Sequence, residues 1–246
     1  MLEVSNISRS FGGVRALGGL SLSVAQGSIT GLIGPNGAGK TTMFGVISGF
    51  VAPDTGSVTY RGADITREPA HLRARRGIAR TFQIVQPFAG LSVGENIAVG
   101  SYLRHAKPSE ARARAEAVAR RVGLGAMLDQ PASALTVSGR KRLELARALA
   151  TEPDLLLLDE VLAGLNPSEI RDILPVIHDI RASGVTILMI EHVMQAVMAL
   201  CDDIFVMAQG RMIAEGKPDA VCRDPQVIEA YLGHGAAARM QEAGNA

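Results

Sequence analysis

Short apolar runs separated by glycine, proline or charged residues recur along the chain. Before residue 61 the runs are brief and rich in Val, Ile and Leu, which is typical of strands joined by tight turns. After residue 150, two nearly continuous apolar runs, 154–159 and 185–190, have the character of strands buried on both faces of a parallel sheet. A stretch with apolar residues at helical spacing, 167–182, separates them. The order strand, helix, strand predicts an α/β fold.

Element boundaries follow from the same pattern. One helix is expected after the glycine-rich segment that follows the run at 29–33, from Lys40 to about residue 50. Another begins at Pro108, with Ser109 or an adjacent residue as its N-cap, and ends at Gly123. Strands are expected at 2–4, 20–24, 29–33, 57–60, 154–159 and 185–190, with a hairpin of 203–208 and 211–214.

The predicted domain organisation places a helical segment inside the strand pattern. Residues 91–150 carry Ala and Arg at helical spacing, whereas strand-type runs lie on both sides. We therefore expect one domain over residues 1–235, with a core of about 1–90 and 151–235 around a mixed sheet. Its N-terminal part is expected to be antiparallel, and 91–150 to form an inserted α-helical subdomain. The Ala- and Gly-rich end, 236–246, is expected to be a disordered tail.

Composition narrows the classes of protein that fit this pattern. The 246 residues are 47% hydrophobic, yet no run approaches the roughly 18 apolar residues that a membrane span needs. The first residues lack the basic flank and apolar segment of a secretion signal, so a cytoplasmic location is expected. A net charge of +1 and 4% aromatic residues indicate no nucleic-acid partner. Cys201 and Cys222 form no C-x-x-C pair and are expected to be reduced, semi-buried thiols.

Candidate chemistry enters with a glycine-rich loop that follows the run at 29–33. Its sequence fits the phosphate-binding pattern G-x-x-x-x-G-K-[ST]. Glycines allow backbone conformations in which successive N–H groups surround an anion, and the following helix points its N-terminus at the phosphates. Lys40 is expected to reach the β- and γ-phosphates, and the Thr41 hydroxyl to hold Mg²⁺. The predicted nucleotide-binding residues here are Gly34, Pro35, Asn36, Gly37, Ala38, Gly39, Lys40, Thr41 and Thr42.

Two acids at the end of the apolar run near residue 159 provide the second half of a nucleotide site. Asp159 at the strand tip is expected to hold the magnesium shell, and Glu160 to orient or deprotonate the attacking water. Two solvated acids at the end of a surface strand are the alternative explanation. Because the phosphate-binding loop is also present, ATP and Mg²⁺ are the expected ligands.

With both motifs present in this order, the chain resembles the ATP-binding cassette (ABC) family, the ATPase subunits of ABC transporters, over about residues 2–233. The resemblance implies further site residues. Phe11 takes the place of the aromatic that stacks on adenine, with an ordinary core phenylalanine as the alternative. Gln83 matches the glutamine that contacts Mg²⁺ and water and senses the membrane partner. His192 follows the run at 185–190, as does the family's switch histidine, which contacts the γ-phosphate.

The resemblance also implies partners and an architecture. ABC ATPases are P-loop NTPases that dimerise head-to-tail, and each ATP lies between the phosphate loop of one subunit and the signature of the other. We therefore expect a second ABC ATPase chain, identical or different, together with transmembrane permease subunits and a periplasmic or extracellular solute-binding protein. The chain would then be peripheral on the inner face of the cell membrane. Residues 163–166 match the D-loop that touches the opposed subunit. Phe82, Phe88 and Leu91 are candidate contacts to the permease, with core packing as the alternative for Phe88.

Local segments bear on the branch of the family. The segments 77–83, 91–96 and 227–233 resemble the ATPases of high-affinity branched-chain amino acid importers. Urea and amide importers share much of this pattern, and 73–78 is similar to the lipopolysaccharide-export ATPase. An importer ATPase is therefore the favoured interpretation. A low-turnover regulatory or assembly subunit, and a soluble ABC protein of DNA repair or translation, are the alternatives.

The family signature, Leu-Ser-Gly-Gly-Gln, is degenerate in this chain. The helical segment from Arg142 onward sets its register. A side chain at Ser138 is expected to impede close approach of the backbone to phosphate, although the helix dipole still favours the anion. Val161 stands where the family usually has proline, and neutral drift with compensation by neighbours is the alternative explanation of both departures. The residues on the signature are Leu135, Thr136, Val137, Ser138 and Gly139.

Basic side chains recur along the helical segments, and such clusters are one feature of proteins that bind RNA or anionic lipid. Acids are interspersed among them and aromatics are absent, so solvated helix faces are the expected interpretation. The residues are Arg73, Arg75, Arg76, Arg112, Arg114, Arg120, Arg121, Arg140, Lys141 and Arg142.

Overall fold

Alternating buried and exposed side chains build an antiparallel sheet at the start of the chain. The computed structural model describes residues 1–84 and 86–232. β1 (Leu2–Phe11) pairs antiparallel with β2 (Val14–Val24) and with β4 (Thr55–Tyr60), and the short β5 (Ala63–Asp64) pairs with β4. This confirms the predicted antiparallel N-terminal part. β1 and β2 are much longer than expected, because their solvent-facing positions are polar and interrupt the apolar runs by which strands were identified.

The chain forms two compact units. The first contains Met1–Pro69 and the chain from Leu188 onward, and the second contains Ala70–Ile187. β8 (Thr186–Ile190) contains the boundary between them and is buried throughout. The helical subdomain expected at 91–150 falls inside the second unit, and its limits stay a prediction.

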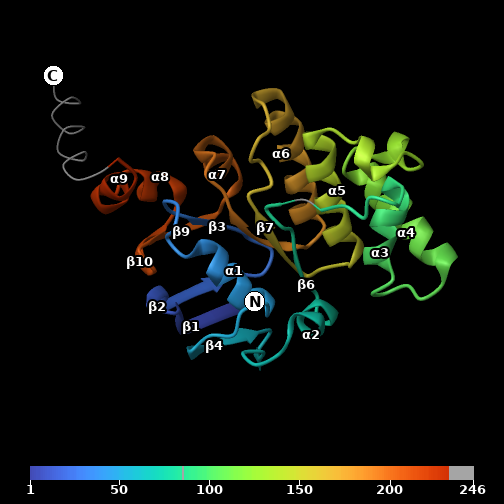
Figure 1. The fold of residues 1–246 in the computed structure, drawn as a ribbon. Helices are drawn as coiled ribbons and strands as arrows, with labels where there is room; N and C mark the ends of the chain where they lie inside the picture. Colours follow the sequence, from blue (N-terminus) through green and yellow to red (C-terminus); the bar gives the residue numbers. More distant parts are fainter. Residues whose placement is uncertain (85, 233–246) are drawn as a thin grey trace, which may run out of the picture. The chain divides into compact units, whose positions relative to one another are not determined.

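In the first unit, a buried parallel pair of strands carries the glycine-rich loop. β3 (Ile29–Ile33) pairs parallel with β9 (Asp203–Ala208), which forms an antiparallel hairpin with β10 (Arg211–Gly216). The loop after β3 leads into α1 (Lys40–Ser48), as the sequence predicted (Figure 1). The remaining helices of this unit are α7 (Met194–Leu200), α8 (Pro218–Cys222) and α9 (Pro225–Leu232).

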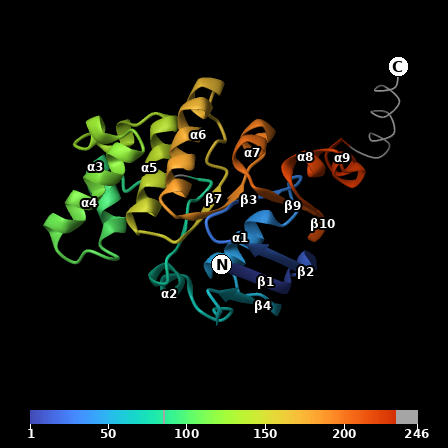
Figure 2. The same cartoon turned by 180° about the vertical axis from the view of Figure 1, so that it is seen from behind.

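In the second unit, a parallel strand pair lies among the helices. β6 (Ile78–Arg80) pairs with β7 (Leu155–Asp159), whose five residues are all buried. The helices α3, α4 and α5 pack against one another and lie side by side in both ribbon views (Figure 2). The helices of this unit are α2 (Ala70–Arg75), α3 (Val93–Ser101), α4 (Pro108–Arg121), α5 (Val137–Ala150) and α6 (Pro167–Ala182).

The helix ends test the capping predictions. α6 begins and ends where the sequence predicted, and Asn166 caps it in a capping box with Glu169. The predicted cap of α4 is wrong, because Lys107 is the N-cap residue and its side chain makes no capping hydrogen bond. Pro108 occupies the first helical position, where its fixed φ and missing N–H are favourable, so Ser109 already lies inside the helix.

Three further expectations concern exposure and the chain end. Cys201 is buried and Cys222 is exposed, so the description as semi-buried is wrong for both, and both are free. Within residues 1–84 and 86–232, no helix combines the length and apolar character needed to cross a membrane. The predicted tail at 236–246 lies outside the described residues.

Candidate nucleotide site

The glycine-rich loop of the first unit has the backbone of a phosphate cradle. Gly34, Gly37 and Gly39 all have positive φ, at 146°, 78° and 101°. A Cβ on Gly34 would collide with the carbonyl oxygen of Met207 on β9. The loop is therefore shaped by glycine conformation and by close packing against the neighbouring strand.

Lys40 stands at the first position of α1, directly after the loop. Its Nζ donates to the carbonyl oxygens of Gly34, at 2.6 Å, and Pro35, at 3.0 Å, and the side chain is 8% exposed. The ammonium therefore lies over the loop, where a phosphate would meet both its charge and the N-terminus of α1. Thr41 is exposed and Thr42 half-buried on the first turn of the same helix.

Other residues of the first unit bear on the nucleotide predictions. Phe11 ends β1 with 46% of its surface exposed, and the Arg9 guanidinium lies 4.8 Å from its ring centroid, so Phe11 is no core residue. His192 is exposed directly after β8. Tyr231 on α9 was not predicted. Burial raises the pKa of its hydroxyl, and a hydrogen bond from the Gly34 backbone offsets only part of this rise.

In the second unit, the end of β7 holds the two predicted acids. Asp159 is 2% exposed, and its Oδ2 accepts a hydrogen bond from Arg80 Nη2 at 2.8 Å. The hydroxyl oxygen of Thr81 accepts the Asp159 backbone N–H at 2.9 Å. Sequence reasoning assigned no role to either Arg80 or Thr81, although the parallel pairing of β6 with β7 brings them to the end of β7.

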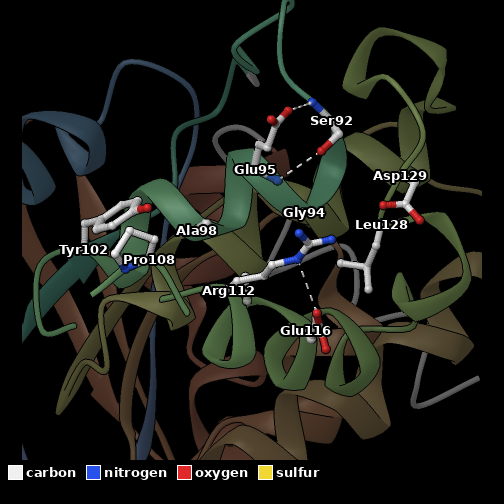
Figure 3. Close-up of a pocket in the computed structure, with 11 residues that line it drawn as sticks. Ser92, Gly94, Glu95, Ala98, Tyr102, Pro108, Arg112, Glu116, Leu128 and Asp129 are labelled. Atoms are coloured by element: carbon white, nitrogen blue, oxygen red, sulfur yellow. Dashed lines mark hydrogen bonds and ion pairs between the residues drawn. The ribbon is translucent and has the colours of Figure 1, made fainter. Parts of the chain in front are cut away.

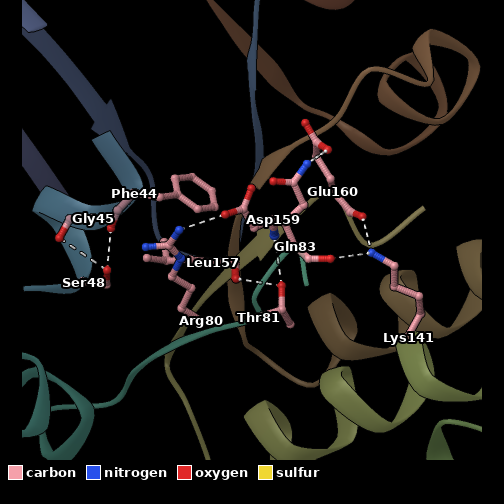
Figure 4. Close-up of polar contacts among 10 residues, drawn as sticks. All are labelled: Phe44, Gly45, Ser48, Arg80, Thr81, Gln83, Lys141, Leu157, Asp159 and Glu160. Carbon is pink, nitrogen blue, oxygen red and sulfur yellow. Dashed lines mark hydrogen bonds and ion pairs between the residues drawn. The ribbon is translucent and has the colours of Figure 1, made fainter. Parts of the chain in front are cut away.

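Glu160 and Gln83 form a direct side-chain pair. Gln83 Nε2 donates to Glu160 Oε2 at 2.7 Å, so the predicted water-positioning acid and the predicted sensor glutamine lie together (Figure 4). Glu160 has φ of 49°, in the left-handed region that non-glycine residues rarely adopt. Such a conformation persists only where surrounding contacts hold it.

Two of the basic residues assigned to solvated helix faces are buried. Arg73 is 1% exposed and Lys141 is 8% exposed. Lys141 lies on α5, and its Nζ donates to the carbonyl oxygens of Glu160, at 3.0 Å, and Gln83, at 3.3 Å (Figure 4). The solvated-face prediction is therefore wrong at both positions, because charge composition does not reveal which carbonyls a long side chain will meet.

The signature residues form the N-terminus of α5. Thr136 is its N-cap, and its hydroxyl accepts the Gly139 N–H at 3.1 Å. Val137 is 57% exposed, Ser138 half-buried and Gly139 buried. A Cβ on Gly139 would lie 3.2 Å from Leu135 atoms, so the glycine fits a tight turn. The position predicted from the register is thus a helix start with its N-cap intact.

A separate cavity of about 500 Å³ lies between α3 and α4 (Figure 3). Four of its polar lining residues pair with each other: Ser92 with Glu95 in a capping box, and Arg112 with Glu116 at 3.6 Å. Hydrogen bonds from Ser92 lower the pKa of Glu95. None of the predicted nucleotide residues lines this cavity.

The predicted magnesium ligands have suitable donor chemistry. Thr41, Gln83 and Asp159 offer hydroxyl, amide and carboxylate oxygens, the hard ligands that Mg²⁺ prefers. Asp159 accepts the hydrogen bond from Arg80 through Oδ2, and its carboxylate has a second oxygen, Oδ1. Among the described residues, no three His, Cys, Asp or Glu side chains cluster into a metal site.

Two family models match the sequence. One, described as ABC transporter, matches residues 17–163, more than half of the chain. The other, described as branched-chain amino acid ATP-binding cassette transporter, matches residues 211–237. The two matches cover different parts of the chain.

Known proteins are similar to the chain over almost its whole length. The branched-chain amino acid transport ATP-binding protein BraF of Pseudomonas aeruginosa is 38% identical, with 95% of this chain and 98% of BraF covered. The lipopolysaccharide export ATP-binding protein LptB of Haemophilus influenzae is 36% identical, with 95% and 97% covered. Among solved structures, the ADP conformation of MJ1267, an ATP-binding cassette of an ABC transporter, superposes with a TM-score of 0.86 at 34% identity, covering 95% of this chain and 99% of MJ1267.

Proposed function

The chain belongs to the ABC transporter ATP-binding family, and from this premise we propose that it hydrolyses ATP to energise import of a branched-chain amino acid or a related small polar solute. The import would pass through a separate permease. The match of residues 211–237 to the branched-chain amino acid family carries the choice of substrate class. Lipopolysaccharide export remains an alternative, because the 36% identity to LptB is close to the 38% identity to BraF. It is the weaker alternative, because residues 211–237 match the branched-chain amino acid family.

The phosphate loop and Lys40 would bind the phosphates of ATP. Lys40 already lies over the loop carbonyls of Gly34 and Pro35, and could turn to the β- and γ-phosphates with little movement. Phe11, which is exposed, would stack on the adenine. His192 would contact the γ-phosphate from the end of β8.

Glu160 would orient or deprotonate the attacking water, with Gln83 holding its carboxylate. The 2.7 Å bond between their side chains supports this role, because a general base must have a fixed orientation. Mg²⁺, held by Thr41, Gln83 and Asp159, would neutralise charge on the phosphates. Arg80, whose Nη2 lies 2.8 Å from Asp159 Oδ2, would hold that carboxylate in position.

A dimer is needed to complete each site. The N-terminus of α5 would face the γ-phosphate held by a second ABC ATPase chain, and the loop at 163–166 would touch that chain. Ser138 and Gly139 stand where the signature has glycine and glutamine, so the site that receives this signature would turn over slowly. A pair of different chains would then have one competent site, built from this chain's loop and the partner's intact signature.

The remaining partners follow from the transport function. Phe82 and Phe88 are 43% and 45% exposed and would contact a short helix of the permease. A periplasmic or extracellular solute-binding protein would deliver the solute to that permease. The chain would thus be peripheral on the cytoplasmic face of the membrane.

The test is turnover and uptake by the complete transporter carrying Glu160→Gln. Loss of the base should lower ATP turnover by on the order of a hundredfold or more. Glu116→Gln, at a half-buried position on α4 outside the predicted nucleotide residues, is the matched control and should keep full activity. Uptake of labelled leucine, compared with urea, tests the substrate class.

Full turnover with Glu160→Gln would show that this chain's site is not the working one. That result would favour the second candidate, a low-turnover regulatory subunit, which the replaced signature residues support.

A further inference from the structure

Three charged side chains on one face of α5 bond to the chain that carries Gln83. Lys141 Nζ donates to the Gln83 carbonyl, the Glu144 carboxylate accepts the Phe82 backbone N–H, and Arg147 Nη1 donates to the Gln86 carbonyl at 3.1 Å. Their spacing of three residues places them on the same side of the helix. The helix that begins at the signature is therefore bonded at three successive points to the loop of the sensor glutamine.

Lys141 differs from Glu144 and Arg147 because its ammonium also bonds the backbone carbonyl of Glu160, the proposed general base. Its ammonium bridges the Gln83 carbonyl, at 3.3 Å, and the Glu160 carbonyl, at 3.0 Å (Figure 4). An ammonium has three donors and no acceptor, and here two of them meet backbone oxygens in a position that is 8% exposed. A buried cation is tolerated only where such partners are provided.

The two residues that Lys141 bridges are the two whose side chains pair. Gln83 Nε2 bonds Glu160 Oε2 at 2.7 Å, and Glu160 has the left-handed φ of 49°. A backbone in this region relaxes unless it is held, and relaxation would swing the carboxylate away. Holding both carbonyls at one ammonium fixes the separation of the two backbones and so the geometry of the side-chain pair.

We propose that Lys141 is a positioning residue for hydrolysis, which fixes Glu160 and Gln83 to the signature helix and so makes their geometry depend on the position of α5. The inference rests on the proposed function, since it assigns Lys141 a part in the same reaction. It differs from that proposal in linking the signature, which would meet the partner's nucleotide, to the base of this chain's own site. An α-helix transmits such a displacement because its hydrogen-bonded backbone is stiff over the two turns involved.

The experiment compares Lys141→Met, Lys141→Arg and the control Lys107→Met. Methionine keeps an unbranched apolar stem and removes the ammonium, and arginine restores donors that can reach carbonyl oxygens. Lys107 is an exposed lysine of the same unit, at the start of α4. Each variant is assayed for kcat and KM in the complete transporter, and the full-length chain is measured separately by amide hydrogen exchange.

Positioning predicts a lower kcat with little change in KM. Lys141→Met should lower kcat by on the order of tenfold to a hundredfold, because small misplacements of a reacting group have effects of this size. Exchange should rise in peptides that contain Gln83 and Glu160 and stay unchanged in peptides from α1. Lys141→Arg should recover most of both effects, and Lys107→Met should match the unmodified chain.

The proposal is overturned if Lys141→Met keeps its kcat, or if exchange rises throughout the chain and arginine gives no recovery, since the lysine would then serve folding alone. If the unmodified transporter has no ATP turnover, the proposed function fails. The exchange of the Gln83 and Glu160 peptides in the isolated chain then still decides whether Lys141 holds them: unchanged protection overturns the inference, and local loss of protection supports it.

Discussion

Gly37 and Gly39 have similar left-handed backbone angles but different surroundings. A Cβ on Gly39 would lie 2.5 Å from the Ala16 carbonyl oxygen and 3.0 Å from a Leu17 methyl carbon, whereas nothing lies within 4 Å of the same position on Gly37. The motif pattern specifies a glycine at residue 39 and accepts any residue at 37. The reason for the requirement at 39 is thus packing as well as conformation.

Gly39→Ala should therefore destabilise the chain more than Gly37→Ala. The strain of a left-handed alanine is about 1 kcal/mol at either position. Crowding against Ala16 and Leu17 should add about 1–3 kcal/mol at residue 39 alone. Urea unfolding of the two variants measures the difference, and equal losses would contradict the packing argument.

The two cysteines should differ in reactivity. Burial, with a smaller contribution from Asp202 and Glu191, raises the pKa of the Cys201 thiol to about 12, so almost no thiolate forms at neutral pH. Cys222 is exposed, and burial raises its pKa as well. Iodoacetamide at pH 8 should modify Cys222 and leave Cys201 intact until the chain unfolds, because the thiolate is the nucleophile. Peptide mass spectrometry checks the order, and prior labelling of Cys201 would refute it.

At the scale of helices, the cap depends on which residue stands just outside the first turn. Asn166 Oδ1 accepts the backbone N–H groups of Ser168, at 2.9 Å, and Glu169, at 3.0 Å. α4 lacks such a cap, since a lysine side chain has no acceptor. Proline opens both helices, so proline alone marks a start without specifying how it is capped.

Asn166→Ala should lower the free energy of unfolding by about 1 kcal/mol, the usual loss for an N-cap. Ser109→Ala should change it by less than about 0.5 kcal/mol, because Ser109 is an exposed residue inside α4. Chemical denaturation of both variants provides the comparison. A larger loss from Ser109→Ala than from Asn166→Ala would reverse the assignment of the caps.

At the scale of the whole molecule, the predicted nucleotide residues are divided between the two units. The phosphate loop, Phe11 and His192 belong to the first, whereas Gln83, Asp159, Glu160 and the signature belong to the second. A nucleotide that binds the folded chain and not the unfolded one should raise its stability.

Mg²⁺ and ATP at about a hundred times their dissociation constant should stabilise the chain by about 2.7 kcal/mol. Lys40→Ala should remove most of this increase, because in the proposed function the ammonium binds the phosphates. Lys217→Ala, which changes an exposed lysine outside the loop, should keep it. Thermal unfolding with and without nucleotide gives the difference for each variant, which cancels any change in intrinsic stability. An undiminished increase in Lys40→Ala would argue against the assigned role.

The sequence by itself determined the features that depend on neighbouring residues. Apolar runs identified β3, β7 and β8, and helical spacing identified α6 with its correct limits. The phosphate loop and the two acids at the end of β7 could be recognised because their functional groups lie on consecutive residues. These features depend only on residues that are close together in the sequence, so they can be predicted without the tertiary structure.

Only the tertiary structure decided which distant groups meet. The lengths of β1 and β2 depend on cross-strand pairing. The sequence does not show this pairing, because polar solvent-facing positions interrupt the apolar runs. Lys141 lies in a basic run for which the composition predicts a solvated helix face. In the structure, α5 places it against the carbonyls of Gln83 and Glu160, which are 58 and 19 residues away in the sequence. Its burial is favourable only because those oxygens are there, and their presence is a property of the folded chain. The sequence therefore predicts the ligand chemistry, and the fold decides which distant group meets the carbonyls of Gln83 and Glu160.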